Sequence, residues 1–183
     1  ILVASSAAMA DILADTGWKA ELDSLASEVP LSLSPRTRYY WTVSVRSDAG
    51  EEATSEASFF ETGKREEPWA AQWISCEKKD RHPVFQKAFS LKAAPASARL
   101  YICGLGLYEA RINGSRVGDE YLTPYCNNYD AWLQVQTYDV TDLLAENCEL
   151  SVTLADGWYA GRFGYASQPG DPGHYGDELK LIA

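Results

Sequence analysis

Hydrophobic and polar residues alternate with a period of two along much of the second half of the chain. The stretches 98–103 and 148–154 each place an apolar side chain at every second position. That period is typical of a strand with one buried face. A third such stretch, 108–112, is followed by Asn113-Gly114, the strongest short sequence signal for a two-residue hairpin. The second half therefore predicts short antiparallel strands joined by tight turns, with a return strand that begins at Val117-Gly118.

The first half carries the same signal over shorter spans. Large apolar residues occupy every second position from Tyr39 to Val45, and Asp48-Ala49-Gly50 is a predicted turn. A second strand is expected over 57–62. A short helix is expected from an N-cap at Ser5 or Ser6 to about Ala14.

Few helices and many short strands are typical of β-sandwiches. In the second half, only one helical turn is expected, with Thr141 as its N-cap. The charged stretch 64–68 interrupts the strand pattern, and we place a linker there. The sequence thus predicts an all-β chain with one domain over residues 1–63 and a second over residues 69–183.

Charge narrows the range of partners. The chain has 16 Lys and Arg residues against 26 Asp and Glu residues, for a formal net charge of −10. Nucleic acids and anionic membrane surfaces both attract basic proteins, so neither is an expected partner. A neutral partner such as a sugar is unaffected by this charge.

The four cysteines give no sign of a metal site. Cys76, Cys103, Cys126 and Cys148 include no CxxC pair, which argues against zinc. Cys103 and Cys148 lie within alternating apolar stretches, so we expect buried free thiols. One disulfide is an alternative. Because disulfides persist mainly in oxidising compartments, the cysteines do not decide the cellular compartment.

Residues 33–39, Leu-Ser-Pro-Arg-Thr-Arg-Tyr, resemble the late strands of a fibronectin type III domain. The resemblance covers residues 1–63 and implies that Tyr39 forms a tyrosine corner. Such a domain runs to about 90–100 residues, so we expect its first strands to be missing. Residues 1–9 also lack the basic start of a signal peptide, and we expect a fragment trimmed at both ends. Open strand edges should then promote association between chains.

Three stretches of the second half resemble the N-terminal sandwich of bacterial α-L-rhamnosidases, a galactose-binding-like jelly roll. They are YICGLGLYEARINGSRVGDEYLTPY, TYDVTDLL and LADGWYAGRFGY, at residues 101–125, 137–144 and 154–165. The match spans about residues 69–183. It implies that catalysis, an inverting hydrolysis by carboxylic acids, belongs to a downstream α/α-barrel of the same polypeptide. The chain alone is then expected to be an inactive accessory region, with that catalytic domain as its partner.

Residues 127–130, Asn-Asn-Tyr-Asp, are the densest cluster of oxygen ligands in a predicted loop. The side chains of Asn127, Asn128 and Asp130 suit the hydroxyls of a sugar, and Asn128 and Asp130 also suit calcium. The resemblance allows a rhamnose-binding module with calcium, which is the alternative function. Asx side chains also build turns, and both interpretations stay open.

A second candidate surface lies further along the chain. Asp156, Trp158 and Tyr159 could present aromatic rings to a sugar, or Trp158 could be a core residue beside a glycine-forced bend. The loop that follows adds Tyr175 and Asp177 to the candidate sugar contacts. It also carries Tyr165, Asp171 and His174, and a loop of this length usually serves binding or an interface.

One glutamate and the two histidines are the residues to consider for a catalytic role. Glu109 lies beside glycines, but a structural carboxylate is the better interpretation, and we expect no catalytic residue in this chain. His82 and His174 are far apart in sequence and are expected to be solvated loop residues.

Overall fold

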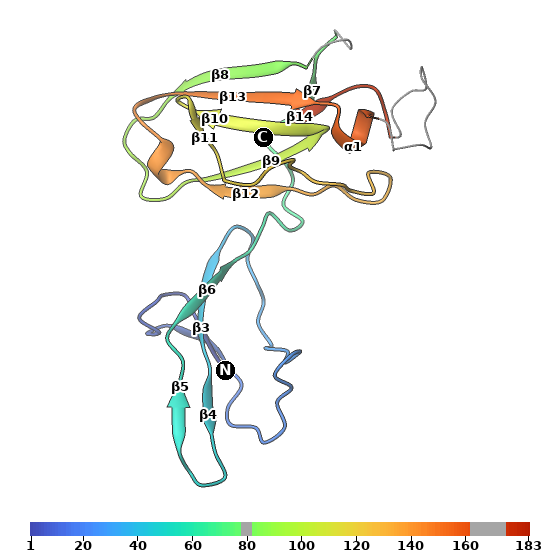
Figure 1. Cartoon of the computed structure of the whole chain (residues 1–183). Coiled ribbons are helices and arrows are strands. Elements are labelled where there is room, and N and C mark those ends of the chain that lie inside the picture. Colours follow the sequence, from blue (N-terminus) through green and yellow to red (C-terminus); the bar gives the residue numbers. More distant parts are fainter. Residues whose placement is uncertain (78–81, 162–174) are drawn as a thin grey trace. The chain divides into compact units, whose positions relative to one another are not determined.

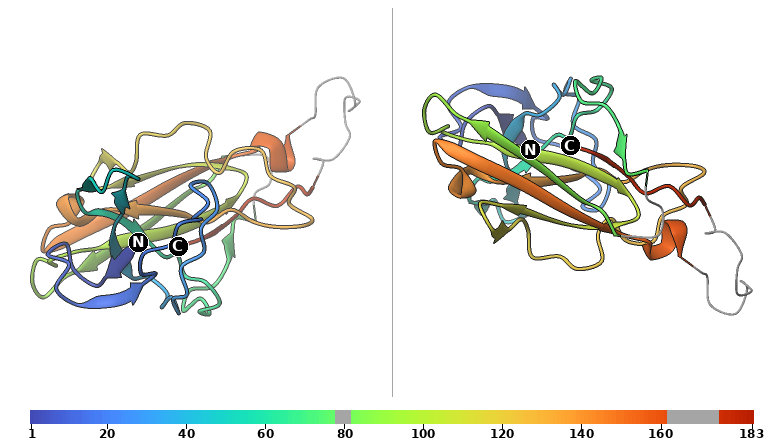
Figure 2. Two further views of the ribbon diagram at one scale, coloured as in Figure 1. Left: turned by 90° about the horizontal axis from the view of Figure 1, so that it is seen from below. Right: turned by 90° about the horizontal axis from the view of Figure 1, so that it is seen from above.

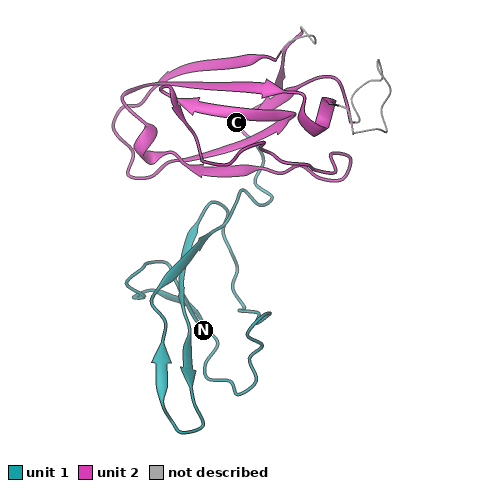
Figure 3. Ribbon diagram, in the orientation of Figure 1, with its two compact units in different colours: residues 1–69 teal, residues 70–183 magenta. Residues whose placement is uncertain are grey.

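The computed structural model describes residues 1–77, 82–161 and 175–183, which form two compact units, Ile1–Trp69 and Ala70–Ala183 (Figures 1 and 3). Both units are built of β-strands, and α1 (Gly157–Ala160) is the one α-helix among these residues. The expected all-β class is confirmed. No helix in the described ranges is long and apolar enough to cross a membrane. The domain limits 1–63 and 69–183, with a linker at 64–68, stay a prediction.

Unit 1 contains a four-stranded antiparallel sheet in the order β2-β1-β3-β6, and a hairpin of β4 and β5. The strands are β1 (Leu2–Ala4), β2 (Ile12–Asp15), β3 (Arg38–Thr42), β4 (Ser44–Arg46), β5 (Glu52–Thr54) and β6 (Ser58–Glu61). Tyr39 and Phe60 are cross-strand partners, and their stacked rings have centroids 5.3 Å apart. This pair anchors β3 against β6.

Tyr39 forms the tyrosine corner that the sequence predicts. Its side chain is 4% exposed, and its hydroxyl accepts a hydrogen bond of 2.8 Å from the backbone N–H of Ser34. A bond from the strand back to the chain a few residues upstream is the mark of this corner in β-sandwiches. It ties the start of β3 to the segment that leads into it.

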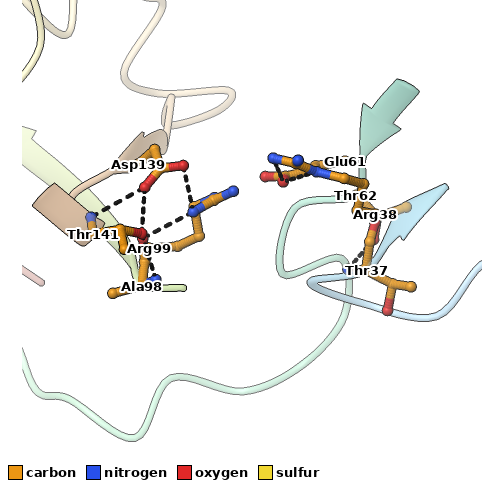
Figure 4. A network of polar contacts seen from close by, with 8 residues as sticks. All are labelled: Thr37, Arg38, Glu61, Thr62, Ala98, Arg99, Asp139 and Thr141. Carbon is orange, nitrogen blue, oxygen red and sulfur yellow. Dashed lines mark hydrogen bonds and ion pairs between the residues drawn. The ribbon is translucent and has the colours of Figure 1, made fainter. Parts of the chain in front are cut away.

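Polar contacts at the same end of β3 fix its register against β6, as Figure 4 shows. Arg38 lies opposite Glu61 in the ladder, and its Nε donates to Glu61 Oε1 at 2.7 Å. Beside this pair, Thr62 Oγ1 accepts a hydrogen bond of 2.9 Å from the N–H of Thr37. A slip by one residue would break both contacts.

The predicted helix over residues 5–14 is wrong. The chain turns tightly after β1, with a hydrogen bond of 3.0 Å from Met9 N–H to Ser6 O, and Met9 adopts a φ of 53°. It then returns as β2, which places Ala14 opposite Val3. A helix of this length gains few hydrogen bonds for its nucleation cost, whereas pairing with β1 satisfies the same backbone groups at once.

Unit 2 is a sandwich of two four-stranded antiparallel sheets, with strand orders β11-β10-β13-β8 and β12-β9-β14-β7. The long strands β10, β13 and β8 run side by side in the right-hand view of Figure 2. The strands are β7 (Ile74–Ser75), β8 (Val84–Ser90), β9 (Arg99–Leu105), β10 (Leu107–Ile112), β11 (Ser115–Arg116), β12 (Gln136–Asp139), β13 (Asn147–Ala155) and β14 (Lys180–Ile182). The core residues between the sheets are Ile102, Tyr108, Ala110, Ile112, Val117, Tyr138, Val140, Val152, Leu154 and Leu181. The alternation of apolar positions in β9, β10 and β13 thus faces one core, as expected.

The hairpin predicted at Asn113-Gly114 is confirmed. Both residues have positive φ, 53° and 80°, as a two-residue type I′ turn requires, and Ile112 faces Ser115 across it. The return strand β11 is shorter and earlier than expected. It ends before Val117, whose N–H still donates to the carbonyl oxygen of Ala110 at 2.9 Å.

The expected helical turn after β12 is present as the 3₁₀ turn η1 (Thr141–Leu143), but the expected cap is wrong. Thr141 lies inside the turn, and its hydroxyl is already engaged (Figure 4). Thr141 Oγ1 donates to Asp139 Oδ1 at 2.6 Å and accepts from the N–H of Ala98 at 2.9 Å. The threonine therefore joins the start of β9 to the end of β12.

All four cysteines are free. Cys103 in β9 and Cys148 in β13 are buried, as expected from the apolar alternation around them. Burial raises the pKa of the Cys103 thiol to about 11, which keeps it protonated and unreactive at neutral pH.

Candidate functional site

Three tyrosine rings meet in unit 2, and we call Tyr129, Tyr159 and Tyr175 the tyrosine cluster. The ring centroids of Tyr129 lie 5.2 Å from those of Tyr159 and 5.1 Å from those of Tyr175, with interplanar angles of 62° and 54°. Tilted and edge-on contacts at this distance are the favoured geometry of aromatic pairs. The cluster joins the loop before β12, the helix α1 and the segment before β14. Each side chain is half-buried, so the rings keep part of their surface in water.

Backbone contacts hold the cluster in place. The N–H of Tyr175 donates to the carbonyl oxygen of Tyr159 at 3.1 Å. Gly176 packs so closely on the Tyr159 ring that a Cβ at this position would lie 2.8 Å from Cζ. The hydroxyl of Tyr129 donates to the carbonyl oxygen of Tyr125 at 3.4 Å. The rings are thus fixed by the chain around them as well as by each other.

The hydroxyls of Tyr129 and Tyr159 are uncharged at neutral pH. Burial raises the pKa of Tyr129 to about 12, although the side-chain amide of Asn127 opposes this rise. Burial also raises the pKa of Tyr159. These phenols can therefore donate and accept hydrogen bonds, which is what recognition of a neutral polyol requires.

Asn127 carries an unpaired acceptor close to the cluster. Its side chain is 3% exposed, and Nδ2 donates to the carbonyl oxygen of Pro124 at 3.2 Å. Its Oδ1 is buried and has no hydrogen-bond partner among residues 1–77, 82–161 and 175–183. A buried acceptor without a donor costs about 1–3 kcal/mol, which a hydroxyl group of a ligand or a water would recover.

Asn128 and Asp130, the two calcium candidates, are both exposed. Asn128 builds a turn, because its carbonyl oxygen accepts hydrogen bonds from Ala131 at 2.9 Å and Trp132 at 3.0 Å. Within the part of the chain that the structure describes, no three His, Cys, Asp or Glu residues gather as metal ligands. Calcium takes six to eight oxygen ligands, so these two side chains alone supply too few.

The remaining sugar-contact candidates lie around α1. Asp156 is exposed immediately before α1, and its side chain does not cap the helix. Trp158 is half-buried within α1, so it is neither a core residue nor a fully presented ring. Asp177 is exposed, two residues after Tyr175. Of all eight candidates, the structure brings only Tyr159 and Tyr175 into one ring cluster. Its central residue, Tyr129, lies within the 127–130 motif but was not among the predicted sugar contacts.

Glu109 lies on the exposed face of β10, in a surface ion-pair group. Its carboxylate is 2.8 Å from Arg111 and 3.7 Å from Arg116. The side chain is 46% exposed. This position agrees with a structural carboxylate held by two guanidinium groups.

His82 is exposed, as expected for a solvated loop residue. Tyr165, Asp171 and His174, which belong to the long predicted loop, lie outside the described residues.

Family models match both units. Residues 93–183 match the α-L-rhamnosidase N-terminal domain, and residues 1–66 match the Rha78A-like N-terminal immunoglobulin domain. The chain belongs to the N-terminal region of the α-L-rhamnosidase family. Immunoglobulin and fibronectin type III domains share the sandwich architecture and the tyrosine corner, so Tyr39 could not separate them in the sequence.

Curated α-L-rhamnosidases from two bacteria resemble the chain. One from Formosa agariphila is 31% identical over 166 residues, which cover 75% of this chain and 17% of that protein. One from Streptomyces avermitilis is 44% identical over 87 residues, which cover 47% of this chain and 8% of that protein. The chain thus spans less than a fifth of the length of these rhamnosidases.

Solved rhamnosidase structures contain the same fold. The native enzyme from Aspergillus terreus matches with a TM-score of 0.75 at 32% identity, over 98% of this chain and 22% of that one. The enzyme from Dictyoglumus thermophilum matches with a TM-score of 0.77 at 29% identity, over 99% of this chain and 22% of that one. Nearly the whole chain therefore corresponds to a minor part of each rhamnosidase.

Proposed function

We propose that the chain is an accessory, non-catalytic region of an α-L-rhamnosidase, which supports a catalytic domain of the same polypeptide. The observation that carries this proposal is coverage, because almost all of this chain corresponds to only 22% of each of two solved rhamnosidases. On this proposal the parent protein cleaves terminal α-L-rhamnosides with inversion, in an α/α-barrel outside residues 1–183.

The chemistry of the described residues supports an accessory role. Glycoside hydrolysis uses two carboxyl groups about 5 to 9.5 Å apart on either side of one bond. Glu109, the carboxylate with the most suggestive sequence context, is instead paired with Arg111 and Arg116 on an exposed strand face. The core of unit 2 consists of apolar and tyrosine side chains.

The test is an assay of the purified 183-residue protein with an aryl α-L-rhamnoside. We expect no turnover above the rate of buffer, whereas a protein that also contains the catalytic domain should release the aryl group. Rhamnosidase activity that co-purifies with the isolated chain over two chromatographic steps would refute the accessory role.

The second candidate function is a rhamnose-binding carbohydrate module. The half-buried rings of the tyrosine cluster favour it, and so does Asn127 Oδ1, which has no hydrogen-bond partner among the described residues. Asn128, Asp130, Asp156, Trp158 and Asp177 would supply the surrounding polar and aromatic contacts on this proposal, with calcium as a further ligand. Aromatic faces and a few polar groups are the usual means of binding a neutral sugar.

Calorimetry with L-rhamnose, with and without calcium, tests the second candidate. Binding should be weak, and Tyr159→Ala should abolish it. The control Tyr121→Ala, at a 74% exposed tyrosine outside the cluster, should leave the heat unchanged. Absence of heat at millimolar sugar in both conditions, or equal loss in both variants, would remove this candidate.

A further inference from the structure

An extended segment of unit 1 has no strand partner among the residues that the structure describes. Residues 28–33, Glu-Val-Pro-Leu-Ser-Leu, alternate between exposed and half-buried side chains, with Val29, Leu31 and Leu33 on the inner face. Alternation of this kind is that of a β-strand. Yet the backbone N–H and C=O groups of this segment make no hydrogen bond to any residue that the structure describes. The segment belongs to none of the sheets, so its backbone groups can pair with a further strand.

The inner face of this segment borders an apolar groove of about 280 Å³. The groove is lined by Ile1, Val3, Val29, Leu31, Leu33, Trp41 and Phe60. Every one of these side chains is hydrophobic, so burial of further apolar groups in the groove is favourable in free energy. An extended segment with unpaired backbone groups beside an apolar groove can accept one more strand.

The segment is complementary to itself. If two copies pair antiparallel about Leu31, then Leu31 faces Leu31 and Val29 faces Leu33, so all inner pairs are apolar. Glu28 falls opposite Ser34, and no like charges meet across the ladder.

Pro30 is compatible with this register. Proline has no N–H, so it is tolerated only where its nitrogen points away from the partner strand. In the register about Leu31, the odd-numbered residues exchange hydrogen bonds and Pro30 falls in a non-hydrogen-bonded pair with Ser32. The missing donor then faces solvent and no ladder bond is lost.

We propose that unit 1 associates with a second copy of this chain through residues 28–33, as an antiparallel strand pair centred on Leu31. The inner faces of both segments then close the two grooves together, in a twofold, isologous interface. This inference goes beyond the proposed function and does not depend on it.

A competing edge is less suited to self-association. Strand β8 (Val84–Ser90) is the longest strand at the border of a sheet in unit 2. Lys87 lies at its centre, so antiparallel self-pairing about that position would set two ammonium groups opposite each other. A lysine on a strand edge is a common protection against pairing.

Net charge sets the expected salt dependence. Two chains of −10 each repel at long range, and salt screens this repulsion, whereas apolar contacts and backbone hydrogen bonds persist. Dimerisation should therefore strengthen as sodium chloride rises from low to physiological concentration. An association driven by ion pairs would weaken instead.

The experiment is sedimentation equilibrium of the 183-residue protein from micromolar to near-millimolar concentration. The unchanged protein should show a monomer–dimer equilibrium. Leu31→Pro removes the N–H at the twofold centre and should weaken the dimer at least tenfold. The matched control Ser32→Pro removes an N–H that points away from the partner and should change the dissociation constant less than twofold.

A peptide with the sequence of residues 27–34 keeps the test independent of variant folding. Added in excess to the unchanged protein, it should convert dimer to peptide-bound monomer. A clean monomer at all concentrations would overturn the proposal. A dimer that persists both with the peptide and in Leu31→Pro would also overturn it. A monomer that binds the peptide would do the same, because residues 28–33 would then take a strand from a source other than a second copy.

Discussion

The tyrosine corner offers the sharpest test of how unit 1 is held together. Tyr39→Phe removes one hydroxyl and keeps the ring that stacks on Phe60 at 5.3 Å. The lost contact is the 2.8 Å hydrogen bond from Ser34 N–H to a side chain that is 4% exposed. A hydrogen bond of this kind contributes about 1 kcal/mol, and a donor left without a partner raises the loss to about 2 kcal/mol. We expect unit 1 to be destabilised by that amount.

Hydrogen exchange measured by NMR can locate this loss. The amide of Ser34 should lose its protection in Tyr39→Phe, and the amides of β3 and β6 should exchange about 5- to 30-fold faster, which corresponds to 1–2 kcal/mol. Tyr40→Phe is the matched control, because this neighbouring tyrosine points to the other side of the strand. Unchanged protection at Ser34, or equal effects in the two variants, would refute the role assigned to the corner.

Four further outcomes are expected. Leu154→Ala, at a side chain with 0% exposure, should lower the free energy of unfolding of unit 2 by about 2–5 kcal/mol in urea titration, whereas Leu25→Ala, at 95% exposure, should change it by less than about 0.5 kcal/mol. Asn113→Ala should cost about 1–2 kcal/mol by the same measurement, because it removes a residue suited to positive φ and its 2.9 Å contact to Glu149 N–H. Gly176→Ala should displace the Tyr159 ring and change the near-ultraviolet circular dichroism of the tyrosines, while far-ultraviolet spectra stay the same. Burial raises the pKa of Tyr129 to about 12, so the unfolded state releases this proton at lower pH than the folded state, and the free energy of unfolding should fall as pH rises from about 10 to about 12. Tyr129→Phe should reduce the dependence of the free energy of unfolding on pH in this range. An unchanged dependence would contradict the burial argument.

The strands of unit 2 could be predicted from the sequence because the positions that alternate as apolar every second residue are also the positions that are buried. In β13, Cys148, Val152 and Leu154 are buried at alternate positions, and Asn113-Gly114 permits few conformations other than a tight hairpin. In unit 1 the helical spacing of Met9, Ile12 and Leu13 was misleading. Ile12 and Leu13 remain 44% and 46% exposed, so that spacing reflects no buried helical face.

The candidate site was less predictable, because its geometry depends on segments far apart in sequence. Tyr129, Tyr159 and Tyr175 have no periodic relation, and the ring contacts arise only when the loop before β12 meets α1. The cap at Thr141 failed for the same reason. Its hydroxyl is taken by Asp139 and by the distant N–H of Ala98, a partner that local sequence cannot reveal.

The position of β14 has a consequence for biosynthesis. Strand Lys180–Ile182 lies between β7 and β9, with Leu181 opposite both Ile74 and Gly104. The centre of that sheet is thus filled by residues translated long after both neighbours, and closing loops of this size makes for high contact order and slow folding. On the ribosome, unit 1 can complete its own ladders early, whereas the nascent unit 2 must wait with an open sheet until residue 182 has left the exit tunnel.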